Sequence, residues 1–158
     1  MKIEQKIGVI GNGFVGGAVK FGFSPNVGCD AEVKVYDKNP EKSTHTLEET
    51  VNESDFIFLS VPTPANKDGS INLDILDGAL NDIDKIHTRK KTNAILIRST
   101  VIPGTTWSLQ TKYPQLNLLF NPEFLTERSA NFDFINQSRF IIGNNGKRGS
   151  LMQSECFV

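Results

Sequence analysis

Short apolar runs alternate with segments of helical periodicity along most of this chain. The runs 56–60 and 94–98 are almost continuously apolar, which is typical of strands covered on both faces of a sheet. Between them, apolar residues recur at helical spacing from Ile75 through Ala79 to Ile86 behind a cap at Asn72, which predicts an amphipathic helix whose apolar stripe is core. The same criteria predict strands at 7–10, Glu32–Tyr36, 116–120 and 139–142, and helices at 15–21, Leu47–Asn52 and Thr105–Lys112.

A glycine-rich turn lies between the first apolar run and the first helical segment. Gly11, Gly13 and Gly16 form the pattern G-x-G-x-x-G. In a strand–turn–helix unit the first glycine permits the tight turn, the second lets the backbone approach a pyrophosphate, and the third lets the helix pack close to the strand. Amide groups at the helix start then face the phosphates. The turn alone is weak evidence for a dinucleotide site, and the rest of the chain has to support it.

Asp37 ends the second predicted strand, about 20 residues after the glycine turn, where dinucleotide-binding folds place an acid that binds the adenosine ribose. An alternative is that Asp37 only forms a turn, because the sequence Asp-Lys-Asn-Pro contains residues that favour turns. A carboxylate here would repel the extra phosphate of NADP. We therefore expect NAD as the cofactor, a preference that the neighbouring Lys38 weakens slightly.

The alternation of strands and helices predicts an α/β fold: a Rossmann-like, doubly wound, mostly parallel sheet with helices on both faces. We expect this domain to occupy residues 1–146, with an irregular tail at 147–158. The polar segment 38–45 is too short for a full crossover helix and leaves room for a short edge strand around 43–46.

Unusual loop sequences follow the carboxyl ends of the predicted strands. In an open α/β sheet that edge is where ligands bind. Five such loops at one edge indicate a ligand site more strongly than any one of them. They are 11–16, Asp37, 61–64, 99–104 and 121–125.

Composition argues against several classes of function. The 17 Lys and Arg residues balance 18 Asp and Glu, and the longest basic run is Arg89-Lys90-Lys91, so nothing indicates nucleic acid or an anionic membrane as a partner. The longest strongly apolar stretch, 56–61, is far too short to span a bilayer, and the first strand begins too near Met1 for a signal peptide. Cys29 and Cys156 have no metal or redox spacing, so we expect no metal and a reducing, cytoplasmic location.

Four blocks of the chain resemble the UDP-glucose/GDP-mannose dehydrogenases, a family of NAD-dependent enzymes that oxidise nucleotide sugars. The last two blocks are specific, because general Rossmann enzymes lack them. The likeness runs from about Lys6 to Gly143 and corresponds to the family's N-terminal, cofactor-binding domain. The blocks are Gly11-Asn12-Gly13-Phe14-Val15-Gly16; Val61-Pro62-Thr63-Pro64 with Asp68-Gly69-Ser70 and Leu73; Arg98-Ser99-Thr100-Val101-Ile102-Pro103-Gly104-Thr105-Thr106; and Asn121-Pro122-Glu123-Phe124-Leu125-Thr126-Glu127, leading to Ser129-Ala130 and Arg139.

The resemblance implies where the cofactor is held. The glycine turn would hold the pyrophosphate, Asp37 the adenosine ribose, and Glu127 would contact a cofactor ribose. The turn residues are Gly11, Asn12, Gly13, Phe14, Val15 and Gly16, and the nicotinamide side would be lined by Val61, Pro62, Thr63, Ser99 and Thr100.

The resemblance also implies the chemistry. Glu123 would be the acid–base helper, with Thr100 helping to hold a catalytic water, and Glu123, Phe124 and Leu125 would begin the nucleotide-sugar site. A carboxylate on a strand-end loop beside a nicotinamide could accept or relay the proton released as hydride leaves. Two purely structural alternatives stay open. Glu123 could be an acid at the start of a helix after Pro122, and the Thr100 hydroxyl could cap its own loop.

Departures from the family pattern limit this interpretation. The family oxidises its sugar alcohol twice through a thiol-bound intermediate, using a cysteine and a lysine from later segments that this chain does not contain. Cys156 lacks the family's glycine-rich context, Cys29 lies in the wrong segment, and Arg128 stands where the family usually has glycine. The segment 38–45 is also short, so we expect one wall of the cofactor site to be reduced.

We therefore expect the isolated chain to bind NAD and to contact a nucleotide sugar only in part, without turnover. A full-length form could be a homo-oligomer. Two alternatives remain: a non-catalytic, truncated nucleotide-binding module, or another Rossmann dehydrogenase of small hydroxyacids, against which the block 121–125 argues.

Overall fold

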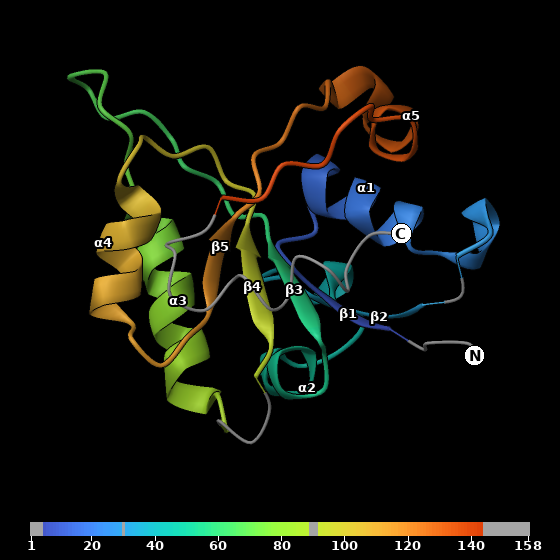
Figure 1. Cartoon of the computed structure of the whole chain (residues 1–158), viewed down its shortest axis with the longest axis horizontal. Coiled ribbons are helices and arrows are strands. Elements are labelled where there is room, and N and C mark those ends of the chain that lie inside the picture. Colours follow the sequence, from blue (N-terminus) through green and yellow to red (C-terminus); the bar gives the residue numbers. More distant parts are fainter. Residues whose placement is uncertain (1–4, 30, 89–91, 144–158) are drawn as a thin grey trace.

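A single sheet of five parallel strands organises the domain. The computed structural model describes residues 5–29, 31–88 and 92–143 of the 158-residue chain. Within them the strands follow the order β2-β1-β3-β4-β5, and every neighbouring pair is parallel (Figure 1). The strands are β1 (Lys6–Ile10), β2 (Glu32–Tyr36), β3 (Phe56–Leu59), β4 (Ala94–Ile97) and β5 (Leu118–Phe120).

Helices connect these strands and cover both faces of the sheet, which confirms the Rossmann-like, doubly wound fold predicted from the sequence. The α-helices are α1 (Phe14–Gly22), α2 (Leu47–Asn52), α3 (Asp74–Ile86), α4 (Thr105–Lys112) and α5 (Ala130–Ile135), and the 3-10 turns are η1 (Pro25–Val27), η2 (Pro40–Lys42) and η3 (Glu127–Ser129). None of these helices is long and apolar enough to cross a membrane, as far as the described ranges extend.

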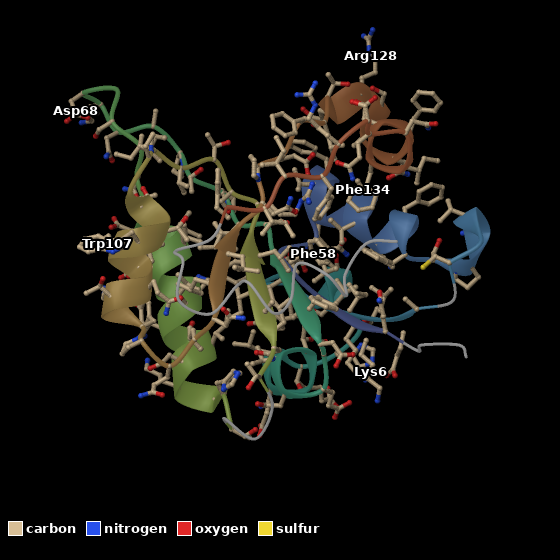
Figure 2. All side chains as sticks on the ribbon, viewed as in Figure 1. Lys6, Phe58, Asp68, Trp107, Arg128 and Phe134 are labelled. Atoms are coloured by element: carbon tan, nitrogen blue, oxygen red, sulfur yellow. The ribbon has the colours of Figure 1, made fainter. Side chains whose placement is uncertain are left out.

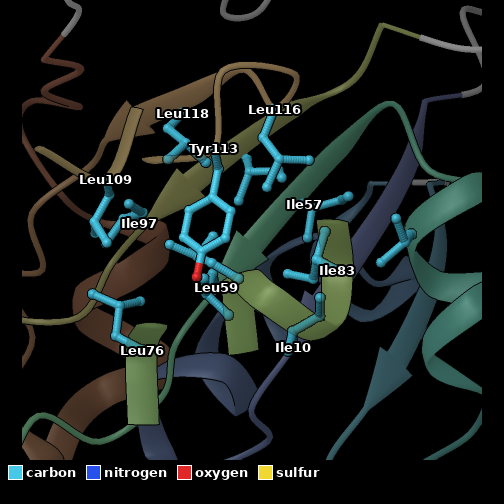
Figure 3. Close-up of a cluster of buried hydrophobic side chains, with 13 residues drawn as sticks. Ile10, Ile57, Leu59, Leu76, Ile83, Ile97, Leu109, Tyr113, Leu116 and Leu118 are labelled. Atoms are coloured by element: carbon cyan, nitrogen blue, oxygen red, sulfur yellow. The ribbon is translucent and has the colours of Figure 1, made fainter. Parts of the chain in front are cut away.

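The core has two halves, one on each face of the sheet, because successive strand residues point to opposite sides. On one face Ile57 and Leu59 of β3 pack with side chains from α2, α3 and α4 (Figure 3). On the other face Phe58, between them in the sequence, packs with side chains from α1 and α5 such as Phe134. The continuous apolar run in β3 is therefore explained by burial on both sides.

The chain turns in opposite directions from the middle of the sheet. From β1 it moves outward to β2, then crosses back to β3 on the other side of β1 and continues outward to β5. The carboxyl ends of β1 and β3 therefore flank the point at which the winding direction reverses. This switch point is where open α/β sheets form a ligand crevice.

The edge strand considered around 43–46 does not form, and side chains satisfy the edge of β2 instead. The amides of Thr44 and His45 both donate to the carbonyl of Val35, at 2.9 and 3.1 Å, and the Thr44 hydroxyl accepts from the Val35 amide at 3.1 Å. The Ser43 hydroxyl accepts from the Asp37 amide at 2.8 Å and donates to its carbonyl at 2.9 Å. A bend whose hydroxyls and amides bond to β2 therefore stands where the sequence analysis allowed for an edge strand.

The predicted strand at 139–142 is also wrong. No strand forms at these described residues. Next to them Gly143 makes an isolated antiparallel bridge, in which it exchanges both backbone hydrogen bonds with Phe120 at 2.7 and 2.9 Å. Helix α3 begins two residues after the predicted cap at Asn72, whose side chain nevertheless accepts from the Asp74 amide at 2.8 Å. The other predicted elements agree with the structure to within two residues, and the tail predicted at 147–158 lies outside the described residues.

Replacing Gly16 with alanine should destabilise the domain, because an added Cβ would lie deep inside the van der Waals radius of the Gly11 carbonyl oxygen. We expect a loss of about 1–3 kcal/mol in the free energy of unfolding, as for other overpacked sites. Chemical denaturation measures it. The matched control is Gly78→Ala on the exposed face of α3, where an added Cβ meets nothing within 4 Å and should stabilise by about 0.5–1 kcal/mol. Equal effects at the two sites would contradict the packing role of Gly16.

Candidate functional site

The three glycines of the turn meet three different steric demands. Gly11 has φ of +91° and its missing Cβ would clash with the carbonyl of Ser60, so both the backbone conformation and the contact with the β3 loop require glycine. Gly16 is buried against the Gly11 carbonyl. Gly13, in contrast, has no heavy atom within 4 Å of the place where a Cβ would stand. The turn is therefore tight on both sides and open at Gly13, the shape that a diphosphate approaching the start of α1 needs.

Asp37 holds this turn in place. One of its carboxylate oxygens accepts from the Asn12 amide at 2.7 Å, and the other accepts from the Asn39 amide at 2.8 Å. The Asn12 side chain donates to the Lys42 carbonyl at 2.8 Å, which ties the turn to the loop after β2. Asp37 therefore does form a turn, as the alternative interpretation of the sequence proposed. Each oxygen still has acceptor capacity for a ribose hydroxyl, so the predicted ribose contact stays a prediction.

A first cavity of about 420 Å³ lies between the glycine turn and helix α3. Gly11, Gly13 and Asp37 line it together with residues for which the sequence analysis had predicted other roles or none. Ile75 and Ala79, predicted as core, face this cavity, and Ile75 is 36% exposed. Its outer wall, which we expected to be reduced, contains Lys38, Lys42, Leu47 and Asp82.

A second cavity of about 410 Å³ adjoins the first across the switch point. The two cavities share Gly13, Ser60, Val61 and Pro62, so together they form one elongated site over the carboxyl ends of β1 and β3. The residues predicted for the nicotinamide side and for chemistry line the second cavity: Val61, Pro62, Thr63, Ser99, Thr100 and Glu123. Phe14 and Val15 of the predicted pyrophosphate turn, Leu125 of the predicted sugar site and Arg98 line it as well.

Two hydroxyls brace the loops after β3 and β4 against each other. Ser99 donates to the Val61 carbonyl at 2.7 Å, and Thr63 donates to the Thr100 carbonyl at 2.9 Å. Because each hydroxyl already donates its hydrogen to the opposite loop, it can only accept a hydrogen bond from a ligand. The hydroxyl of Thr100, on an exposed residue, has no hydrogen bond of this kind to the opposite loop.

Glu123 lies in the second cavity as a carboxylate engaged on both oxygens. One oxygen accepts from the amides of Phe124 and Leu125 at 2.8 and 3.1 Å. The other forms an ion pair with Arg98. Burial lowers the pKa of Arg98 to about 10, which leaves the guanidinium charged at neutral pH. The sequence analysis assigned Arg98 no role, although a basic residue ending an apolar strand was a visible signal.

The remaining predicted residues lie toward helix α5. Phe124 is 60% exposed and, with Leu125, lines a third cavity of about 620 Å³ beside α5. Glu127 begins the exposed turn η3 and lines neither the first nor the second cavity. Arg128 projects from that turn away from the domain (Figure 2), so its side chain fills no space that the family's glycine would leave open.

In the part of the chain that the structure describes, no three His, Cys, Asp or Glu side chains lie close enough together to hold a metal ion. Cys29 is a half-buried free thiol, and Cys156 lies outside the described residues. The site therefore consists of a backbone cradle, carboxylates, hydroxyls and one buried guanidinium.

This parallel sheet, with a glycine turn, an acid after β2 and a two-part cavity at its switch point, defines a dinucleotide-binding domain of the dehydrogenase type. The chain belongs to the UDP-glucose/GDP-mannose dehydrogenase family: the model of that family's NAD binding domain matches residues 38–157. NAD is accordingly its cofactor. The matched region begins one residue after Asp37, so the glycine turn adds evidence that the family match does not include.

Known relatives agree with this assignment. UDP-glucose 6-dehydrogenase of Campylobacter jejuni is 32% identical over 68% of this chain and 27% of its own length. An uncharacterised protein of Methanocaldococcus jannaschii is 32% identical over 94% of this chain and 20% of its own length. This chain therefore spans only about a fifth to a quarter of these curated relatives.

Solved structures show the same partial coverage. A UDP-glucose dehydrogenase from Pyrobaculum islandicum superposes with a TM-score of 0.76 at 27% identity, over 94% of this chain and 43% of that one. GDP-mannose dehydrogenase from Pseudomonas aeruginosa, solved as a ternary complex, has a TM-score of 0.73 at 25% identity with the same coverage. A 3-hydroxyisobutyrate dehydrogenase from Mycobacterium tuberculosis, at 15% identity, shares the fold alone.

The turn that carries Glu127 should loosen in acid, because Asp133 organises it as an anion. One Asp133 oxygen accepts from the Thr126 amide at 2.9 Å, the Thr126 hydroxyl at 2.8 Å and the Ser129 hydroxyl at 2.9 Å. These bonds, the backbone bond first, hold the pKa of Asp133 below its ordinary value of 3.8. The stability it contributes is therefore present above pH 3.8 and is lost as the pH falls through the lowered folded-state pKa.

We expect the Thr126 amide resonance to titrate with a midpoint below 3.8 in an NMR pH series. Asp133→Ala should abolish that titration and shift the Thr126 and Ser129 resonances at neutral pH. A midpoint at or above 3.8 would contradict the proposed order of the turn.

Proposed function

We propose that this chain is the NAD-binding part of a nucleotide-sugar 6-dehydrogenase, which oxidises a sugar primary alcohol to a carboxylate by hydride transfer to NAD. The observation that carries the proposal is the continuity of the two cavities at the switch point. One end is lined by the acid after β2 and the other by a carboxylate and hydroxyls. A dinucleotide needs one long site with chemically different ends, and this arrangement supplies it.

In this proposal the first cavity holds the adenosine half of the cofactor. The open turn at Gly13 and the start of α1 receive the pyrophosphate, and Asp37 accepts from the adenosine ribose hydroxyls. Lys42 also lines this cavity and can complement the pyrophosphate charge or donate to the ribose. Ile75 and Ala79 offer an apolar wall for the adenine ring.

The second cavity holds the nicotinamide ring, which accepts a hydride when the cofactor is bound. Val61, Pro62 and Thr63 form one wall, and Ser99 and Thr100 form a second. Glu123 acts as the acid–base helper: the sugar alcohol loses its hydroxyl proton as its carbon loses hydride, and the carboxylate takes or relays that proton. Thr100 helps to hold a catalytic water. Glu127, on the exposed turn η3 outside both cavities, would contact a part of a cofactor ribose that projects from them.

The nucleotide sugar would meet this domain at Phe124 and Leu125 and would be bound mainly by segments that this chain does not contain. The coverage of 43% of the solved relatives supports that view. The catalytic cysteine and lysine of the family belong to those segments. We propose a cytoplasmic enzyme that forms a homo-oligomer in its full-length form and has no nucleic-acid or membrane partner.

Asp37→Asn should weaken NAD binding about tenfold, since hydrogen bonds to charged groups contribute about 1.5–3 kcal/mol. It should weaken NADP binding less, because the variant no longer repels the extra phosphate. Titration calorimetry with both nucleotides measures the ratio. Asp68→Asn, in an exposed loop outside both cavities, is the matched control and should change neither affinity. An unchanged NAD-to-NADP ratio in the Asp37 variant would contradict the ribose role.

The isolated chain should bind NAD without producing NADH from UDP-glucose, as followed by absorbance. Steady NADH formation would show that the proposed division between this chain and the missing segments is wrong. No NAD binding at millimolar concentration would instead favour a non-catalytic module. Glu127→Ala separates these two views further: it should weaken NAD binding if the site is functional and leave a vestigial site unchanged.

A further inference from the structure

Arg98 carries a positive charge inside the domain. It directly follows strand β4, its amide donates to the Leu59 carbonyl at 2.9 Å, and only 2% of its surface is exposed. The carbon at the centre of its guanidinium lies 5.8 Å from the centroid of the Phe58 ring and 5.5 Å from that of Phe134. Figure 2 labels both rings, one on the sheet and the other on α5. Burying such a charge costs free energy unless it is paired. The hydrogen-bonding partners of Arg98 therefore indicate its role in the domain.

One segment, directly after β5, supplies both hydrogen-bonding partners. One terminal nitrogen of Arg98 donates to the Asn121 side-chain oxygen, and the other donates to Glu123. Asn121 is 1% exposed, and its own amide group donates to the Ile141 carbonyl at 2.8 Å. The guanidinium therefore connects β4, the end of β5, helix α5 and the chain that returns to the sheet at Gly143.

The hydrogen bonds of Glu123 leave it little acceptor capacity. A carboxylate has about four acceptor positions, two on each oxygen. The amides of Phe124 and Leu125 occupy both positions of one oxygen, and Arg98 occupies one position of the other. The more open acceptor position is on the oxygen that Arg98 holds, because the other oxygen already accepts from two amides. Any ligand or water that donates to Glu123 in this cavity thus meets an oxygen whose location Arg98 sets.

We propose that Arg98 is a positioning residue of the nicotinamide half of the site: it locks the Glu123 carboxylate, and through it the amides of Phe124 and Leu125, so that Glu123 and Leu125 form a fixed wall of the second cavity. This inference rests on the proposed function only for the identity of the ligand. The planar guanidinium donates to Asn121 and Glu123 at once while it packs between two rings, and its charge balances the charge of the carboxylate. Lysine has one donor centre and cannot reproduce both contacts and the ring packing.

The first test concerns the wall itself and needs no cofactor. In the whole chain, Arg98→Met keeps the apolar volume but removes both donors. Hydrogen exchange at the Phe124 and Leu125 amides, measured by NMR, should accelerate at least tenfold relative to the β4 amides Ile95 and Leu96, which report global stability. Arg98→Lys should give intermediate acceleration. Thr111→Met, at an exposed position of α4, is the control and should leave the ratio unchanged. If all amides accelerate together, Arg98 acts only on global stability and the proposal is wrong.

The second test separates the two halves of the bound cofactor. Saturation-transfer NMR reports contact of the protein with the adenine and nicotinamide protons of NAD separately. Arg98→Met should reduce the nicotinamide signals several-fold and leave the adenine signals within error, whereas Asp37→Asn should weaken both through lost affinity. Equal loss of both signals in Arg98→Met, or no loss, would overturn the positioning role. If the unsubstituted chain shows no NAD signal, the proposed function fails, while the exchange test still decides what Arg98 does to the wall.

Discussion

The close contact of backbone with backbone at the glycine turn is the constraint on which the rest of the structure depends. Gly11 approaches the Ser60 carbonyl of the β3 loop, and Gly16 approaches the Gly11 carbonyl, with no room for a Cβ at either place. These contacts hold the start of α1 over the carboxyl ends of the neighbouring strands β1 and β3. The winding direction of the sheet reverses between these two strands. Both cavities open on Gly13 because that residue alone of the three has free space beside it. One steric arrangement therefore joins the helix to the sheet and creates the site.

The two halves of the site are stabilised by different physics. At the first cavity, Asp37 accepts hydrogen bonds from backbone amides of the turn and of its own loop, a partly exposed arrangement made by segments close to the ends of β1 and β2. At the second cavity, a buried guanidinium is paired with a carboxylate and placed between two aromatic rings. Water screens the first arrangement, whereas the second lies where electrostatic interactions are strong and unpaired charge is costly. In the second half, loss of a partner would therefore leave a buried charge unpaired. Under the proposed function it is also the half where a hydride donor and acceptor would have to be aligned.

Sequence reasoning reached the fold and the edge of the sheet on which the site lies because both depend on periodic patterns and on loop position. Phe56–Leu59 and Ala94–Ile97 were recognisable as strands since burial on both faces requires continuous apolar runs. The errors arose where tertiary contacts outweigh local pattern. The apolar stripe of α3 indicates a buried face but cannot show that Ile75 lies beyond the end of the sheet, where the stripe meets a cavity. Three consecutive apolar residues at 140–142 favour a strand, yet regular strand pairing does not form there, and the backbone bridge to the sheet is made by Gly143. Arg98 was visible in the sequence, but its partners lie 23 and 25 residues away, and no local rule connects them.

The polar segment 38–45 after β2 serves both the edge of the sheet and the lining of the site. Strand β2 lies at the edge of the sheet, so its outer side has no neighbouring strand among the described residues. Ser43 and Thr44 satisfy that edge through hydroxyls and amides, and the Asn12 side chain draws the Lys42 carbonyl toward the glycine turn. The same bonds therefore bring Lys42 to the mouth of the first cavity. The segment thus acts twice, once in the hydrogen bonding of the sheet edge and once in the lining of the first cavity.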